Sequence, residues 1–249
     1  MRTRSVPARR GLQWIVDGFW LFRKSPLMWI ALTLVLALLW MLMFVVRVVG
    51  PLLFNLFSPV FFAGLMIGCK DLEEGRDLEL RHAFAGFRQH AGPLVTLGGV
   101  YLVGMIVVVG LIFIAASGTP LSTVLSGKHA DVDSVITTMR HLALALTVSL
   151  ALYVPLLMLV WFAPLLVVFH GMNAVPAMKL SFEACRKNVM PFTVYGLAIL
   201  VLWFIATVPF LLGLFVVLPV LFCSIYASYK DVFEPDADAP APKTVNGEP

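Results

Sequence analysis

Charge is scarce in this 249-residue chain. Only 13% of its residues are charged, whereas an average soluble domain has about 25%. Hydrophobic residues make up 60%, and the mean hydropathy is +0.94. A water-soluble fold of this size cannot bury so many apolar side chains, because its surface needs polar residues. The composition therefore weighs strongly against a soluble enzyme and predicts an all-α, polytopic membrane helix bundle.

The sequence also lacks the signatures of catalysis and metal binding. It has no HExxH, GxSxG or Walker glycine motif. Cys69, Cys185 and Cys223 lie far apart without metal-ligand spacing, and we interpret them as buried apolar side chains. The five histidines have no ligand spacing either. We therefore expect a non-enzymatic protein with no catalytic residue, no metal and no cofactor.

Long uncharged runs dominate what is present. Four runs have the length of about 20 residues that spans a bilayer: 27–46, 48–69, 93–116 and 142–169. A fifth run, 191–229, is long enough for two passes, and Pro209 with Gly213 marks its break. The sequence thus predicts six transmembrane helices, the last two near 192–209 and 213–229. No Asp, Glu, Lys or Arg lies within these spans, which weighs against a proton- or sodium-coupled transporter.

The basic residues are divided unequally between the two sides of the membrane. Fifteen of the 18 lysines and arginines fall on the side of the N-terminus, and only Arg47, Lys128 and Arg140 fall on the other. The positive-inside rule then places both termini in the cytoplasm. The net charge of +4 is interpreted as contact with anionic lipid, and no nucleic-acid partner is expected.

This orientation divides the chain into hairpins and flanking segments. Arg47 and the Gly50-Pro51 pair predict a tight turn between the first two helices. The tail is rich in proline, alanine and acids and is expected to be disordered. The predicted divisions are a basic arm with an amphipathic helix (1–26), hairpin 1 (27–69), an amphipathic helix (70–92), helices 3 and 4 (93–169, with a periplasmic loop at 117–141), an amphipathic helix (170–190), hairpin 3 (191–229) and the tail (230–249).

The three cytoplasmic leader segments, 1–26, 70–92 and 170–190, share a residue order. The pattern F-x-x-(F/C)-R-(K/Q) begins at Phe19, Phe84 and Phe182, and a proline opens each following apolar run. Lys-Asp pairs also follow the second and sixth spans, at 70–71 and 230–231. The simplest account is three copies of one unit, an amphipathic helix followed by a transmembrane hairpin. The alternative is that aromatic and basic residues are common at any membrane entrance.

Helical periodicity gives each leader segment an apolar stripe. The stripes are Leu12, Ile15, Val16, Phe19 and Phe22; Leu80, Ala83, Phe84 and Phe87; and Val175, Met178, Phe182, Cys185 and Val189. Such helices lie in the membrane interface with Lys and Arg toward the headgroups, although packing on the bundle would also bury the stripes. Five basic residues near their ends are predicted to contact anionic lipid: Arg23, Lys24, Arg88, Arg186 and Lys187.

Polar side chains within the spans are few. The candidates are Asn55, Tyr153 and Tyr195. We expect Asn55 to hydrogen-bond to a neighbouring helix rather than to a substrate, because hydrocarbon offers no other partner. Prolines also interrupt several spans; broken helices form binding sites in some transporters and occur in passive bundles as well.

Three motifs carry a resemblance to a known family: Arg4-Ser5-Val6-Pro7, Trp161-Phe162-Ala163-Pro164 and Tyr226-Ala227-Ser228-Tyr229-Lys230-Asp231. Through them the chain resembles an uncharacterised family of six-helix inner-membrane proteins from betaproteobacteria, over most of residues 4–233. The resemblance implies a bacterial inner (plasma) membrane location and a six-helix bundle. It implies no activity and no catalytic residue.

Two functions remain open. The first is a non-enzymatic membrane protein that organises lipid, or binds a protein partner or a second copy of itself, at the cytoplasmic leaflet. The alternative is a transporter or channel for a small uncharged or lipid-like solute, with its site among the proline-broken helices. An aqueous cavity lined by Asn55 or the tyrosines favours the alternative, and a tightly packed bundle favours the first.

Overall fold

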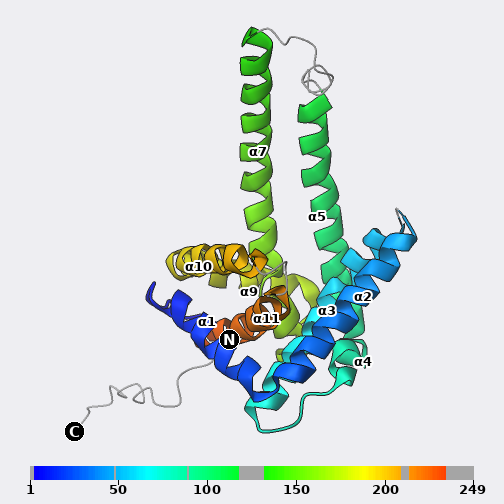
Figure 1. Ribbon diagram of the computed structural model, residues 1–249, viewed down its shortest axis with the longest axis vertical. Coiled ribbons are helices and arrows are strands. Elements are labelled where there is room, and N and C mark those ends of the chain that lie inside the picture. Colours follow the sequence, from blue (N-terminus) through cyan, green and yellow to red (C-terminus); the bar gives the residue numbers. More distant parts are fainter. Residues whose placement is uncertain (1–2, 48, 89, 118–131, 209–212, 234–249) are drawn as a thin grey trace, which may run out of the picture.

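The computed structural model describes residues 3–47, 49–88, 90–117, 132–208 and 213–233 (Figure 1). In this part of the chain all regular structure is helical. The elements in chain order are α1 (Arg10–Lys24), α2 (Pro26–Val45), α3 (Val49–Glu73), the 3-10 helix η1 (Leu80–Phe84), α4 (Ala85–Arg88), α5 (Ala91–Ser117), α7 (Val132–Val160), α8 (Ala163–His170), α9 (Ala174–Lys187), α10 (Val189–Thr207) and α11 (Leu214–Phe233).

The described residues contain six segments long and apolar enough to cross a membrane, which confirms the predicted number of spans. Helices α7 and α8 together form the fourth of these. The spans pair as three hairpins, α2 with α3, α5 with α7, and α10 with α11. Figure 1 shows α5 and α7 standing side by side and extending beyond the other helices.

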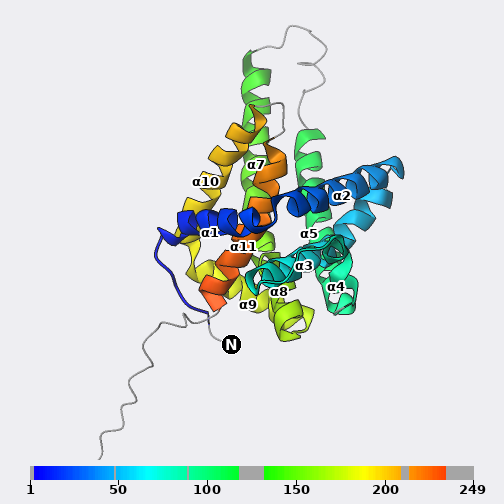
Figure 2. The same ribbon diagram turned by 60° about the horizontal axis from the view of Figure 1, so that its bottom comes forward.

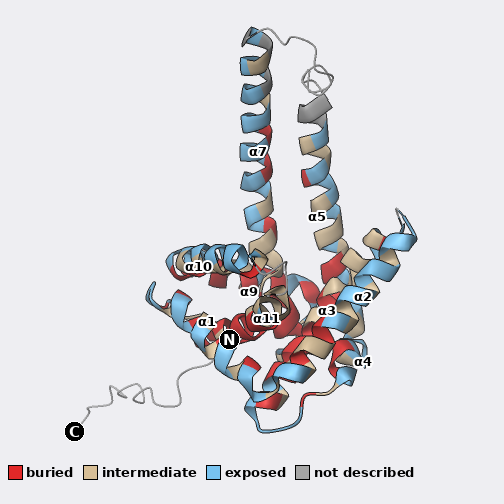
Figure 3. Cartoon of the chain, in the orientation of Figure 1, coloured by how far each residue is buried: buried red, intermediate tan, exposed pale blue. Residues whose placement is uncertain are grey.

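Within each hairpin the second span lies inside and the first lies at the periphery. In α2, α5 and α10 only 17% of an 18-residue apolar stretch is buried. The buried share of the same length is 50% in α3, 44% in α7 with α8, and 56% in α11. Figure 3 shows buried residues where α3, α8 and α11 meet and exposed residues along α5 and α7. The peripheral helices therefore present apolar side chains outward, as lipid contact requires.

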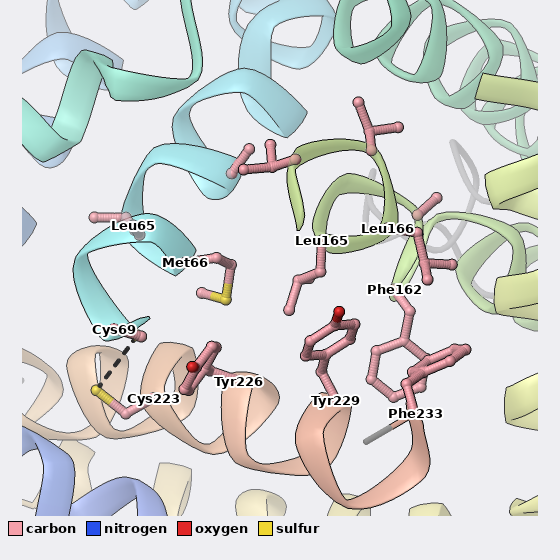
Figure 4. Close-up of a cluster of buried hydrophobic side chains, with 14 of the residues drawn as sticks. Leu65, Met66, Cys69, Phe162, Leu165, Leu166, Cys223, Tyr226, Tyr229 and Phe233 are labelled. Atoms are coloured by element: carbon pink, nitrogen blue, oxygen red, sulfur yellow. Dashed lines mark hydrogen bonds between the residues drawn. The ribbon is translucent and has the colours of Figure 1, made fainter. Parts of the chain in front are cut away.

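The core is formed by the ends of the inner spans that lead into the predicted cytoplasm. Figure 4 shows Met66 of α3 pointing toward Leu165 of α8 and Tyr229 of α11. Cys69 and Cys223 lie in the same cluster with their sulfur atoms 4.0 Å apart. All three cysteines are buried and form no disulfide, which confirms their interpretation as buried core residues.

The second and third leader segments each pack against the hairpin that precedes them in the chain, and the first leader packs against the last hairpin. The second leader, η1 with α4, packs on α2 and α3, and the third, α9, packs on α7 and α8. The first leader, α1, packs on α10 and α11, the last hairpin of the chain. Figure 2 shows α1 lying across α11. The threefold pattern in the sequence therefore corresponds to a cyclic arrangement in space.

Glycine allows the closest of these contacts. A Cβ atom added at Gly18 of α1 would lie 2.6 Å from the backbone nitrogen of Ser224 in α11. One added at Gly86 of α4 would lie 2.1 Å from the carbonyl oxygen of Val60 in α3. The leader backbones can approach the inner spans this closely only because these positions lack a side chain.

The second leader is shorter and less regular than expected. Gly75 adopts a left-handed conformation (φ 80°) after α3. The side chains of Glu79 and His82 then form a capping box that begins η1. Helical structure ends at Arg88, so this segment forms two short helical turns instead of one long amphipathic helix.

The predicted turn at Gly50-Pro51 is wrong, because both residues belong to the first turn of α3. Proline is tolerated there since its missing N–H would have no helical partner. The actual turn lies at Val46 and Arg47, and Arg47 has a positive φ of 37°. Gly50 instead lets α3 touch α2, because a Cβ there would lie 1.6 Å from the carbonyl oxygen of Met43.

Two further boundaries differ from the prediction. Helix α7 begins at Val132, inside the segment predicted as the 117–141 loop. Helix α11 continues through Lys230 to Phe233, beyond the predicted end at Tyr229. Both helices continue through charged residues past their apolar runs, so a prediction from the length of the uncharged run makes each helix too short. The remainder of the loop (118–131), Pro209 and the tail beyond Phe233 lie outside the described residues.

Candidate functional site

A buried carboxylate at the end of α11 joins the two ends of the described chain. The side chain of Asp231 is only 2% exposed, and its oxygens accept hydrogen bonds from Arg4 Nη2 and Arg10 Nε at 2.5 Å each. The indole Nε1 of Trp14 donates a third, at 2.8 Å. Two arginines and an indole therefore satisfy a charge that would be costly to bury alone.

The segment before α1 is held in place by a second buried polar side chain. Asn188, between α9 and α10, accepts a hydrogen bond from the backbone N–H of Val6 and donates one to the carbonyl oxygen of Arg4, both at 2.9 Å. The backbone N–H of Arg4 donates to the carbonyl oxygen of Val232 at 3.1 Å. These bonds fix Arg4 beside Asp231.

The other Lys-Asp pair of the repeat uses the same chemistry. At the end of α3, Asp71 interacts with Arg76 Nη2 at 2.5 Å and with His82 Nε2 at 3.0 Å. In each case an arginine and a ring N–H flank an aspartate, and the ring belongs to the leader segment that packs on that helix. Helix α8 ends instead with His170, whose Nε2 lies 2.5 Å from the Tyr229 hydroxyl of α11. Two of the three repeats therefore share an aspartate-centred junction.

The five predicted lipid-contacting residues are all exposed, but they fall into two groups. The two lysines are engaged within the chain. Lys24 Nζ donates to the carbonyl oxygen of Leu72 at 3.0 Å, and Lys187 Nζ pairs with Glu183 at 2.6 Å. That hydrogen bond also lowers the pKa of Glu183, which keeps the pair ionised. Arg23, Arg88 and Arg186 form no salt bridge to any described carboxylate; Arg23 instead lies over the Trp20 ring, 4.8 Å from its centre.

Helix α1 has two apolar faces. Trp14, Gly18 and Phe22 face the bundle and are buried. Much of the predicted stripe faces the opposite way, since Leu12 is 53% exposed and Phe19 is 43% exposed. The exposed part of the stripe, with Leu12 and Phe19, therefore points away from α10 and α11, where a membrane interface can cover it.

The intramembrane polar residues have structural partners. The prediction that Asn55 hydrogen-bonds to a neighbouring helix is wrong. Its side-chain amide donates to the carbonyl oxygen of Pro51 in its own helix, at 2.9 Å. The Ser58 hydroxyl caps the carbonyl of Asn55, which Pro59 leaves without its usual donor. Tyr195 does join two helices, since its hydroxyl lies 2.7 Å from Ser224 Oγ.

An apolar cavity of about 350 Å³ lies among the inner spans. Its wall contains two prolines, Pro59 inside α3 and Pro164 in the first turn of α8. The wall includes Tyr101, whose hydroxyl interacts with that of Tyr153, but Asn55, Tyr153 and Tyr195 are not among its residues. The cavity therefore does not have the polar lining expected of an aqueous solute pathway.

Sequence reasoning missed the Asp231 junction. The repeated Lys-Asp pair was visible, but its partners Arg4, Arg10 and Trp14 lie more than 200 residues away along the chain. A tryptophan on the polar flank of an otherwise regular apolar stripe was the available signal. Asn188 had no signal, because a lone asparagine beside a helix start is common in any chain.

Comparison with known proteins adds a relative but no activity. No protein-family model matches the chain, and no solved structure matches it. The chain is similar to a probable inner membrane protein of Burkholderia thailandensis, with 31% identity over 94% of each chain. The similarity therefore extends over nearly the full length of both proteins.

Proposed function

Since this chain belongs to the family of that Burkholderia inner membrane protein, we propose, from its own geometry, that it is a non-enzymatic integral protein of the inner membrane that organises anionic lipid at the cytoplasmic leaflet. Arg23, Arg88 and Arg186 hold the headgroups. The excess of basic residues on the side of the termini supports the cytoplasmic placement of these arginines.

One observation carries the proposal. The three arginines occupy the same place in the three repeats, are exposed, and form no salt bridge with any carboxylate in the described part of the chain. Arg4 and Arg10, in contrast, are paired with Asp231. A guanidinium that forms no salt bridge within the chain can bind a phosphate in bidentate geometry.

Neighbouring apolar side chains support the same role. Phe19 and Trp20 are 43% and 59% exposed beside Arg23, and Phe87 is 40% exposed beside Arg88. Val189 is 53% exposed three residues after Arg186. An arginine flanked by exposed apolar residues suits the boundary between hydrocarbon and headgroups, because both parts are then in their preferred surroundings.

The test replaces Arg23, Arg88 and Arg186 by Gln, which keeps side-chain length and hydrogen bonding but removes the charge. We call Arg23, Arg88 and Arg186 the arginine ring, and the protein in which all three are Gln the ring variant. The control replaces Arg9, Arg81 and Lys179 by Gln, three exposed basic residues outside the arginine ring. Native mass spectrometry counts the phosphatidylglycerol and cardiolipin that each purified protein retains. The ring variant should lose anionic lipid while the control matches wild type.

Topology is checked first by labelling introduced cysteines, because these arginines also orient the chain during insertion. Equal retention of anionic lipid in wild type and ring variant, with unchanged topology, contradicts the proposal. An equal loss in both variants also contradicts it, because net charge would then be the cause.

Transport of a lipid-like solute is a second candidate, favoured by the apolar cavity near Pro59 and Pro164. Vesicles containing the purified protein and a fluorescent lipid test it by quenching of the outer leaflet. Faster lipid exchange than in protein-free vesicles supports transport, and an unchanged rate leaves lipid organisation as the function.

A further inference from the structure

The cavity among the inner spans has a wall drawn from all three hairpins. Leu36 belongs to α2, Phe61 to α3, Tyr101 to α5, Leu157 to α7 and Phe222 to α11. Its volume of about 350 Å³ lies at the lower end of the range for small-molecule sites. Since these helices cross the membrane, hydrocarbon is the solvent that surrounds them.

The wall contains few groups that could recognise a polar ligand. No Asp, Glu, Lys, Arg or His belongs to it. The Ser58 hydroxyl is already bonded to Asn55, and the Tyr101 hydroxyl interacts with Tyr153. The Trp161 indole N–H has no partner among the described residues, but one donor cannot specify a polar solute.

The cavity is connected by ring contacts to one of the proposed headgroup arginines. Phe61 lines the cavity, and its ring packs edge-on against the Phe87 ring with a centroid distance of 5.4 Å. Phe87 precedes Arg88 in α4. An apolar path therefore leads from the cavity toward a basic residue at the predicted cytoplasmic boundary.

We propose that the cavity binds one acyl chain of a membrane phospholipid. The inference rests on the proposed function, because Arg88 would hold the headgroup of the same lipid. The acyl chain fills the space between Leu36, Phe61 and Leu157 and packs against the two prolines of the wall, Pro59 and Pro164. The occupant is a resident lipid, because the one unpaired donor of the described wall, the Trp161 N–H, is not enough to orient a soluble metabolite.

The experiment uses phosphatidylglycerol with a photoactivatable diazirine at the end of one acyl chain. The lipid is incorporated with full-length protein into vesicles, and mass spectrometry maps the crosslinked residues after irradiation. We expect crosslinks at cavity residues such as Phe61 and Leu157. Parallel samples contain the same diazirine on a free fatty acid or on phosphatidylcholine.

Two variants fill the cavity from different helices, so that a folding defect in one leaves the other informative. They are Leu36→Trp and Val160→Phe. The matched controls are Leu34→Trp and Val154→Phe, on the same helices at positions 42% and 45% exposed. Each filling variant should reduce the cavity crosslinks about tenfold, because the larger side chain occupies the space of the acyl chain and overpacking of this kind weakens binding by about one tenfold step. The controls should retain them.

Crosslinks confined to exposed residues such as Val103 and Leu150 would overturn the proposal, since only bulk lipid would then be in contact. Labelling of the cavity by the free fatty acid but not by phospholipid would also overturn it. If the arginines do not bind headgroups, the result is different. Phosphatidylcholine would then label the cavity as strongly as phosphatidylglycerol does, and the filling variants would reduce the crosslinks of both lipids.

Discussion

The indole of Trp14 donates a hydrogen bond to the buried carboxylate of Asp231 across 217 residues of chain, at 2.8 Å. Trp14 itself is fully buried, with its ring against Phe192 and Tyr195 of α10. The same carboxylate binds Arg4 and Arg10. The beginning of the chain is therefore an integral part of its last hairpin.

Replacing Asp231 by Asn should destabilise this junction severely. The change removes the carboxylate charge that pairs with Arg4 and Arg10. Breaking a buried pair costs 3–5 kcal/mol, and we expect about 3 kcal/mol because each arginine is partly exposed to solvent. Thermal unfolding in detergent should show a lower midpoint, and protease should cleave before α1 more rapidly.

The control for this prediction is Asp17→Asn. Asp17 accepts a hydrogen bond from Gln13 on the exposed side of α1. Its replacement should change stability by less than about 0.5 kcal/mol. Equal stability of the two variants would show that the Asp231 junction contributes little.

Adding a methyl group at Gly18 should separate α1 from α11. The new Cβ would lie 2.6 Å from Ser224 N and 2.8 Å from its Cα and Cβ, none of which can move away by a side-chain rotation. Overpacking of this kind costs about 1–3 kcal/mol. Gly196→Ala in α10 is the matched change, since nothing lies within 4 Å of its Cβ position. Thermal unfolding should show a loss only for Gly18→Ala.

The asymmetry of basic residues predicts the topology. Reporter fusions at Lys24, Gln89, Lys187 and Asp236 should be active as cytoplasmic fusions, and a fusion near Lys128 should be periplasmic. A periplasmic result at Asp236 would mean that α10 or α11 does not span the membrane.

The native cysteines should be unreactive in the folded protein. Burial raises the pKa of the Cys185 thiol to about 12, so it remains protonated at pH 8 and lacks the reactive thiolate. Cys69 and Cys223 are inaccessible in the core. Maleimide should label none of the three in detergent and all three after denaturation in SDS. A Lys179→Cys variant, exposed on α9, checks that the reagent is active; labelling of folded wild type would contradict the buried core.

Apolar length was sufficient to predict the spans and the hairpins, and helical periodicity predicted the leader helices α1 and α9. They could not show which hairpin each leader contacts. Both faces of α1 are apolar, so periodicity selected Leu12 and Phe19, whereas Trp14 and Gly18 make the tertiary contact. Hydrophobicity does not distinguish a face that meets lipid from one that meets protein, because the two surroundings are equally apolar.

Asn55 shows a second limit of sequence reasoning. Its isolation in an apolar run indicated a need for a hydrogen-bond partner, and the structure supplies one four residues earlier at Pro51. A local bond competes with an interhelical one whenever the side chain can reach its own backbone. The position of Asn55 in the sequence does not decide between the local and the interhelical bond. The cavity could not be predicted either, because its wall depends on how the helices pack.

The cyclic packing of the leader segments has a consequence for biosynthesis. The second and third leaders follow their partner hairpins and can dock as soon as they are made. The first leader is synthesised before its partner α11. Helix α1 must therefore wait until α11 has been synthesised, and its docking onto α11 completes the cyclic packing.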